Sequence, residues 1–124
     1  MRFLPEPSAP AGHPTRTGLL LVNLGSPDAP APAAVRRYLA EFLSDPRVVE
    51  LPRFLWLPIL YGIVLTLRPR EAARRYASIW MPEGSPLMVW SRRQGERLRG
   101  ELSGRGLDVE VALAMRYGIP SLAD

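Results

Sequence analysis

The sequence feature that most constrains the fold is an uninterrupted apolar run, TGLLLVN, at Thr17–Asn23. The residues that close it, Gly25-Ser26-Pro27-Asp28, favour a turn. A run of this kind indicates a strand buried on both faces, and such strands occur in parallel sheets with helices on each side. A second candidate strand, Asp108–Met115, ends at Arg116-Tyr117-Gly118. The two strands therefore predict a parallel sheet.

The sequence between the two strands predicts several helices. Pro32 opens the first at Pro32–Leu43, whose apolar face contains Leu39, Phe42 and Leu43. Pro69 is expected to restart a helix that continues to Trp80. The last helix is expected at Leu87–Leu102, with Leu87, Trp90, Leu98 and Leu102 facing inward.

This order of elements predicts an α/β fold that opens a doubly wound parallel sheet. Residues 1–16 are rich in proline and have no periodicity, so we expect a flexible leader there. Residues 17–124 then form the amino-terminal portion of the domain, that is, part of its first Rossmann-like half. Two strands do not make a stable open sheet, so the chain is expected to be part of a longer fold.

The segment Phe54–Leu67 contains fourteen residues and no charge, and it is flanked by Arg53 and Arg68. It is shorter than the roughly 20 residues that a membrane span requires. A helix that is apolar nearly all round lies in a core or cleft wall, or at a membrane surface. The sequence leaves both interpretations open.

Composition excludes several classes of site. The chain has no cysteine and one histidine, His13, which excludes disulfides, thiolate metal sites and a histidine-based triad. All sixteen basic residues are arginine, and the net charge is +4. The arginines form scattered pairs among acidic residues, so nucleic-acid binding is not expected. The start of the chain lacks the apolar stretch of a secretory signal, which predicts a cytoplasmic protein.

Ligands of open parallel sheets bind beyond the carboxyl ends of the strands. Here these ends carry Asn23–Pro27 and Arg116–Gly118, without a dinucleotide or Walker motif. Gly25 would allow close approach of a ligand, although a tight turn explains it equally and is the favoured interpretation. With the apolar segment, Tyr76 and the arginines near residue 68, the pattern suggests a cleft for a flat apolar ligand that carries carboxylates.

Five segments resemble the ferrochelatase family, whose members insert ferrous iron into a porphyrin. They are GLLLVNLGSPDAP at 18–30, RRYLAEFLSDPRVVELP at 36–52, RYASIWMPEGSPL at 75–87, SRRQGERL at 91–98 and VALAMRYGIPS at 111–121. Their order is that of the family, and the resemblance covers residues 17–124.

The resemblance implies a set of porphyrin-binding residues. Leu24 falls where the family has a side chain facing the porphyrin and, as leucine, offers packing only. Arg68, Tyr76 and Ser85 match positions that contact the porphyrin and its propionates, and Arg116 and Tyr117 match a pair that lines the same pocket. Phe54–Leu67 matches a lip-like region that meets the membrane in some members.

The resemblance also implies what these residues do not supply. The family's catalytic histidine and glutamate correspond to positions beyond residue 124, so no catalytic and no metal-binding residue is expected here. We expect insertion of Fe²⁺ into protoporphyrin IX by the full-length protein, with Fe²⁺ as a substrate bound mainly by residues beyond this chain, no organic cofactor, and little activity of this chain alone. Coproporphyrin as substrate, or a non-catalytic porphyrin- or membrane-binding module, are the alternatives.

Overall fold

The two predicted strands form a two-stranded parallel sheet. The computed structural model describes Gly12 and residues 16–122, so most of the proposed leader at 1–16 lies outside the described residues. Strands β1 (Thr17–Asn23) and β2 (Val109–Met115) pair from Thr17 opposite Val109 to Asn23 opposite Met115. The α/β class with a parallel sheet is therefore confirmed.

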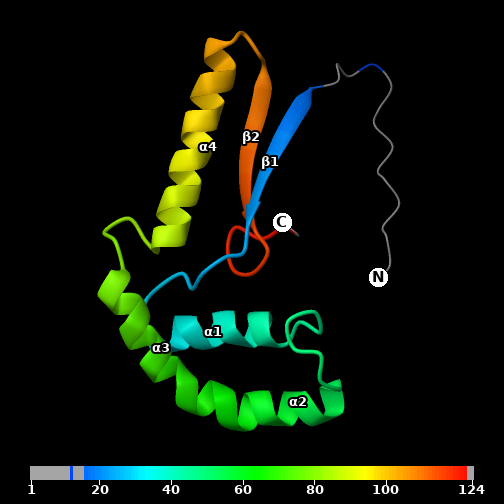
Figure 1. Ribbon diagram of the computed structural model, residues 1–124, viewed down its shortest axis with the longest axis vertical. Helices are drawn as coiled ribbons and strands as arrows, with labels where there is room; N and C mark the ends of the chain where they lie inside the picture. The colour runs from blue at the N-terminus through cyan, green and yellow to red at the C-terminus, as the bar shows by residue number, and fades with distance from the viewer. Residues whose placement is uncertain (1–11, 13–15, 123–124) are drawn as a thin grey trace.

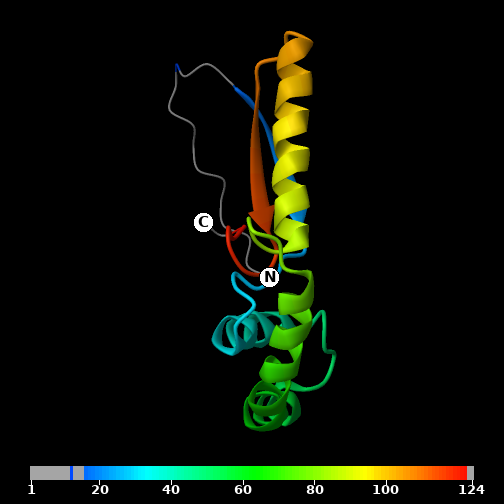
Figure 2. The ribbon, with the colours of Figure 1, turned by 90° about the vertical axis from the view of Figure 1, so that its left-hand side faces the viewer.

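Helix α4 (Pro86–Gly104) packs along β2 and covers one face of this sheet (Figure 2). The buried residues of this helix are Val89, Ser91 and Gly95. Ser91 accepts a hydrogen bond from Asn23 Nδ2 at 3.1 Å, and Arg99 Nη2 donates to the carbonyl of Val111 at 2.7 Å. The predicted inward position of Trp90 is wrong: this side chain is 54% exposed.

The prediction that β1 is buried on both faces is also wrong for this chain. Leu20 and Val22 are 55% and 47% exposed, because no helix of the described residues covers the face opposite α4. The apolar run therefore does form a strand, but no helix among residues 16–122 covers one of its faces.

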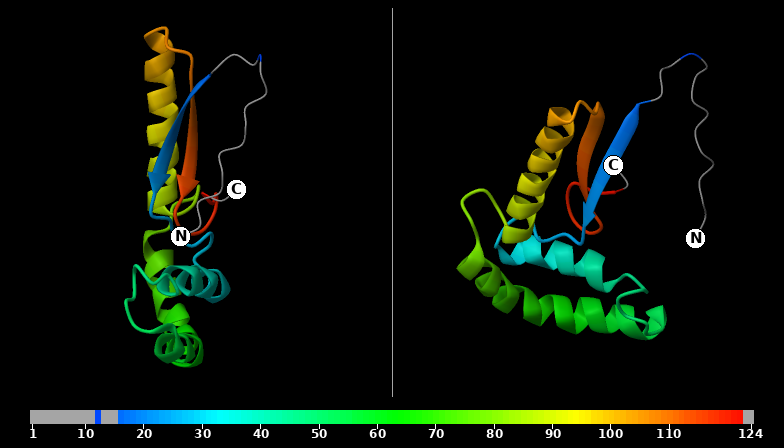
Figure 3. Two further views of the ribbon diagram at one scale, coloured as in Figure 1. Left: turned by 90° about the vertical axis from the view of Figure 1, so that its right-hand side faces the viewer. Right: turned by 45° about the horizontal axis from the view of Figure 1, so that its top comes forward.

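The other helices form a second layer below the sheet (Figure 1). Helix α1 (Pro32–Leu43) lies beside a long helical segment that consists of α2 (Arg53–Ile59), a π-helical turn η1 (Leu60–Val64) and α3 (Leu65–Ile79). Figure 3 shows the same arrangement from two further sides. Val35, Leu60 and Leu65 are almost completely buried in this layer.

The predicted break at Pro69 does not occur. Helix α3 continues through Pro69, which is buried. A proline ring inside a helix collides with the carbonyl four residues earlier, here that of Leu65. Leu65 has ψ of −11°, far from the usual helical value near −42°, and it directly follows the π-helical turn. The altered turn therefore reorients the carbonyl that would meet the ring.

The apolar segment has one buried and one exposed side. Leu60 and Leu65 face inward, whereas Phe54 and Leu67 are 78% and 70% exposed. The exposed apolar face comprises Phe54, Leu55, Ile59, Tyr61, Ile63 and Leu67. No helix of the described residues is long and apolar enough to cross a membrane.

Candidate functional site

The loops that follow β1 and β2 lie against each other at the carboxyl ends of the strands. The strand pairing continues into them: Arg116 N–H donates to the carbonyl of Asn23, and Tyr117 N–H to that of Leu24, both at 2.9 Å. At Gly25, φ is +113°, and a Cβ there would overlap the carbonyl oxygen of Tyr117. Gly25 is therefore required by a close approach of backbone to backbone, which neither the turn nor the ligand interpretation had identified.

Tyr38 of α1 connects the helix layer to these loops. Its hydroxyl donates to the carbonyl of Gly25 at 3.1 Å, and its ring stacks on Phe42, which meets Tyr117 edge-on. Burial is the main cause that raises the pKa of Tyr38 to about 12, so the hydroxyl stays protonated and keeps its donor role.

The carboxyl end of α1 presents two acidic side chains to the loop after β2. Asp45 Oδ2 accepts from Arg116 Nη2 at 2.9 Å and from the Tyr117 hydroxyl at 2.7 Å. Asp45 Oδ1 accepts from the Arg47 backbone N–H at 2.9 Å, and Glu41 accepts from Gly118 N–H at 3.0 Å. These contacts attach the Arg116-Tyr117 pair to the helix layer.

The same contacts determine the protonation states in this cluster. The Arg47 N–H, the Tyr117 hydroxyl and the Arg116 charge hold the pKa of Asp45 below its ordinary value of 3.8. The hydrogen bond to Asp45 raises the pKa of Tyr117. Near neutral pH Asp45 is therefore a carboxylate and Tyr117 a neutral phenol that donates to it.

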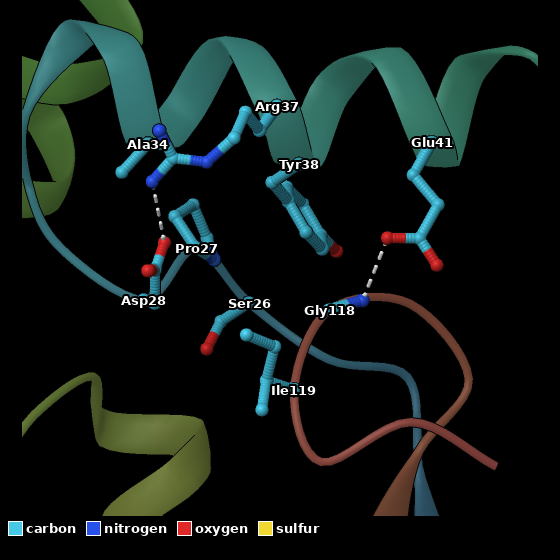
Figure 4. Close-up of a pocket in the computed structure, with 9 residues that line it drawn as sticks. All are labelled: Ser26, Pro27, Asp28, Ala34, Arg37, Tyr38, Glu41, Gly118 and Ile119. Carbon is cyan, nitrogen blue, oxygen red and sulfur yellow. Dashed lines mark hydrogen bonds and ion pairs between the residues drawn. The ribbon is translucent and has the colours of Figure 1, made fainter. Parts of the chain in front are cut away.

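Two cavities adjoin this junction. One, of about 180 Å³, lies between α1 and the two loops and is lined by residues that include Ser26, Arg37, Tyr38 and Gly118 (Figure 4). In it Arg37 faces Asp28 at 3.5 Å. The other, of about 540 Å³, is more open and has three guanidinium groups in its lining, those of Arg47, Arg53 and Arg116. Two carboxylates, Glu41 and Asp45, also line it, so the three arginines leave an excess of one positive charge, which suits an anionic ligand group.

Four of the six predicted porphyrin-binding residues lie at or next to this junction. Leu24, Arg116 and Tyr117 lie in the two loops, with Leu24 51% exposed and Tyr117 6% exposed. Ser85 is adjacent, since its hydroxyl is hydrogen-bonded to that of Ser26. Ser85 also accepts from Met88 N–H at 3.2 Å as the N-cap of α4, so this side chain, 3% exposed, has a structural task.

The remaining two residues lie on α3. The Tyr76 ring packs edge-on against Trp80, and burial raises its pKa. Arg68 lines a separate hollow with Glu71, Ala72 and Arg75. Porphyrin contact stays a prediction for all six residues.

Sequence reasoning missed Tyr38, Glu41 and Asp45. The spacing of Glu41 and Asp45 could have indicated a shared site. Residues four apart lie on the same side of a helix, and these two stand in the last turn of α1 and just beyond its end. Among residues 16–122, no group of three or more His, Cys, Asp or Glu side chains could hold a metal ion.

The comparisons with known proteins identify the family. Residues 16–124 match the family described as ferrochelatase. The chain belongs to the ferrochelatase family. It is 61% identical over 127 residues to a ferrochelatase of Polaromonas sp., which covers 99% of this chain and 35% of that protein. For the ferrochelatase of Bordetella pertussis the identity is 58% over 129 residues, covering 98% and 36%.

A third ferrochelatase, from Dechloromonas aromatica, is 56% identical over 123 residues, covering 99% of this chain and 34% of the relative. The chain thus spans about a third of the length of these curated relatives. The resemblance inferred from the five segments is confirmed by these matches.

Proposed function

We propose that this chain forms one wall of the porphyrin site in an enzyme that inserts Fe²⁺ into a porphyrin, a lyase reaction of haem biosynthesis. The observation that carries the proposal is the ferrochelatase match over residues 16–124. The Arg116-Tyr117 pair, at the strand ends where α/β sheets bind ligands, supports it.

The chemistry divides into binding and proton transfer. Metal insertion exchanges two pyrrole N–H protons for one Fe²⁺ ion and transfers no electron, so we propose that no organic cofactor takes part. The arginines of this chain suit the propionates, because a guanidinium pairs with a carboxylate through two parallel hydrogen bonds. The base for the pyrrole protons and the ligand for iron are proposed to lie outside residues 16–122.

Protoporphyrin IX, which carries two propionates, is our leading substrate, and coproporphyrin, which carries four, is the alternative. Both present carboxylates at the ring edge, so the arginines suit either one. Metal insertion measured with each porphyrin separately decides between them.

A chimera tests the activity directly. The corresponding region of the Polaromonas relative is replaced by residues 16–124 of this chain, and insertion of Fe²⁺ is followed by the change of the porphyrin absorption spectrum. We expect the chimera to be active and Arg116→Ala to raise the KM for porphyrin. Arg92→Ala, at an exposed position of α4, is the matched control. A folded chimera without activity contradicts the proposed function.

A peripheral membrane contact is a second proposal, favoured by the exposed apolar face of α2, η1 and α3. We propose that this face docks on the inner surface of the cytoplasmic membrane while the rest of the protein stays in the cytoplasm. Phe54→Asp with Leu67→Asp should abolish co-sedimentation with vesicles, whereas Leu107→Asp, 51% exposed in the turn after α4, should not. Equal binding of all variants contradicts the docking proposal.

A further inference from the structure

The end of α1 holds the loop after β2 through two carboxylates, which we call the acidic clamp (Glu41 and Asp45). Asp45 accepts hydrogen bonds from the Arg116 side chain and the Tyr117 hydroxyl, and Glu41 accepts one from the backbone N–H of Gly118. Asp45 and Arg116 are 71 residues apart in the sequence. The clamp therefore adds side-chain contacts from the end of α1 to a loop whose backbone is already hydrogen-bonded to the loop after β1.

The contacts of Asp45 restrain Arg116 without using up its guanidinium group. The Asp45 side chain is 10% exposed, whereas that of Arg116 is 43% exposed. Arg116 donates one hydrogen bond to Asp45, from Nη2, and its guanidinium carbon lies 4.9 Å from the centre of the Tyr117 ring. A guanidinium has five N–H donors, so donors remain for a ligand in the adjoining cavity.

We propose that Asp45 is a positioning residue, which orders the Arg116 side chain so that it receives a carboxylate of the substrate. The inference rests on the proposed function and deepens it, because it names the group that prepares the anion site. Arginine has many side-chain rotamers, and a ligand that must immobilise one loses affinity. In the ligand-free protein, contacts with Asp45 and the Tyr117 ring already restrict the rotamers of the Arg116 side chain.

The charge of Asp45 acts in the opposite direction, since it repels an incoming carboxylate. Two features oppose this repulsion: Asp45 Oδ2 is occupied by the Arg116 and Tyr117 donors, and Arg47 and Arg53 line the same cavity, where they outnumber the other acid, Glu41. We therefore expect the ordering of Arg116 to dominate. Asp45→Asn, which keeps the shape of the side chain and removes its charge, should raise the KM for a dicarboxylate porphyrin about threefold to tenfold.

The test uses the chimera described above and separates positioning from folding. Asp45→Asn should change KM and leave kcat within about twofold, and it should have no further effect when Arg116 is already alanine. Glu96→Gln, an exposed acid of α4, is the matched control. A porphyrin whose propionates are methyl esters should show no difference between Asp45→Asn and the unchanged chimera, because it offers no carboxylate to Arg116.

Several results would overturn the inference. The first is an unchanged or lower KM for porphyrin in Asp45→Asn. The second is that Asp45→Asn raises this KM just as much when Arg116 is already alanine. The third is that Asp45→Asn raises the KM for the methyl ester as much as that for the free acid. An inactive unchanged chimera contradicts the proposed function instead. In that case nitrogen NMR of the 124-residue chain decides whether Asp45 restrains Arg116: the two Nη signals of Arg116 should be separate, and should merge in Asp45→Asn. Merged signals in the unchanged chain refute the restraint itself.

Discussion

Gly25→Ala is the substitution that most directly tests the junction of the two loops. An added Cβ would overlap the carbonyl oxygen of Tyr117 and lie 2.9 Å from its carbonyl carbon. Tyr117 cannot withdraw easily, because it is 6% exposed and its N–H and hydroxyl are both bonded. The backbone at Gly25, with φ of +113°, is in addition one that alanine rarely adopts.

The expected loss of stability follows from these contacts. The strained backbone costs about 1–3 kcal/mol. Separating the loops breaks the hydrogen bond from Tyr38 to Gly25 and that from Tyr117 N–H to Leu24, each worth about 1 kcal/mol. Together the free energy of unfolding should fall by about 3–5 kcal/mol, a large part of the 5–15 kcal/mol typical of a small domain.

Urea unfolding followed by tryptophan fluorescence measures this loss. With a slope of about 1–3 kcal/mol per molar urea, the midpoint should fall by more than about 1 M. Gly100→Ala is the control, since Gly100 lies in α4 with no atom within 4 Å of an added Cβ. It should raise stability by about 0.5–1 kcal/mol. A Gly25→Ala midpoint equal to that of the unchanged chain refutes the reasoning.

Three further predictions concern side chains at the same junction. Ser85→Ala removes the N-cap of α4 and the partner of Ser26, so urea titration should show a loss of about 2 kcal/mol. Because folding raises the pKa of Tyr38, the protonated hydroxyl contributes fully to the free energy of unfolding below pH 10. This contribution is lost as the pH rises toward 12. Tyr38→Phe should weaken this alkaline loss, as midpoints at neutral and alkaline pH will reveal. Because folding lowers the pKa of Asp45, its carboxylate contributes fully to the free energy of unfolding above the ordinary pKa of 3.8. This contribution is lost as the pH falls below that value. Acid titration of Asp45→Asn should therefore show a smaller loss of stability in this range than the unchanged chain.

The sequence predicted the elements whose signals are local. The bounds of β1 and α1 agree with the structure, because an apolar run closed by a turn and a proline in the first helical turn act within a few residues. Pro69 was misjudged for a related reason. Proline normally ends or bends a helix, and only the π-helical turn before Leu65 makes its ring fit.

Burial was predicted less well, since it depends on which neighbour is present. The apolar character of β1 and of the segment 54–67 is plain in the sequence, yet Leu20 and Phe54 are exposed in residues 16–122. On α4 the large Trp90 was expected inward, but the buried residues of this helix are Val89, Ser91 and Gly95. The periodicity of the large apolar residues therefore did not identify a buried side that includes a serine and a glycine.

In the two loops of the candidate site, the sequence predicted only those residues that directly follow a strand. Arg116 and Tyr117 stand out in the sequence because they directly follow a strand, and Leu24 does so after the other strand. Asp45 is one of two acids in an irregular segment, and its role depends on α1 lying beneath both loops. That arrangement depends in turn on Gly25 and Gly118, which let the two backbones touch. The residues that position the anion site are therefore specified by tertiary packing, and substitution of a glycine in one loop should disturb the arginine in the other.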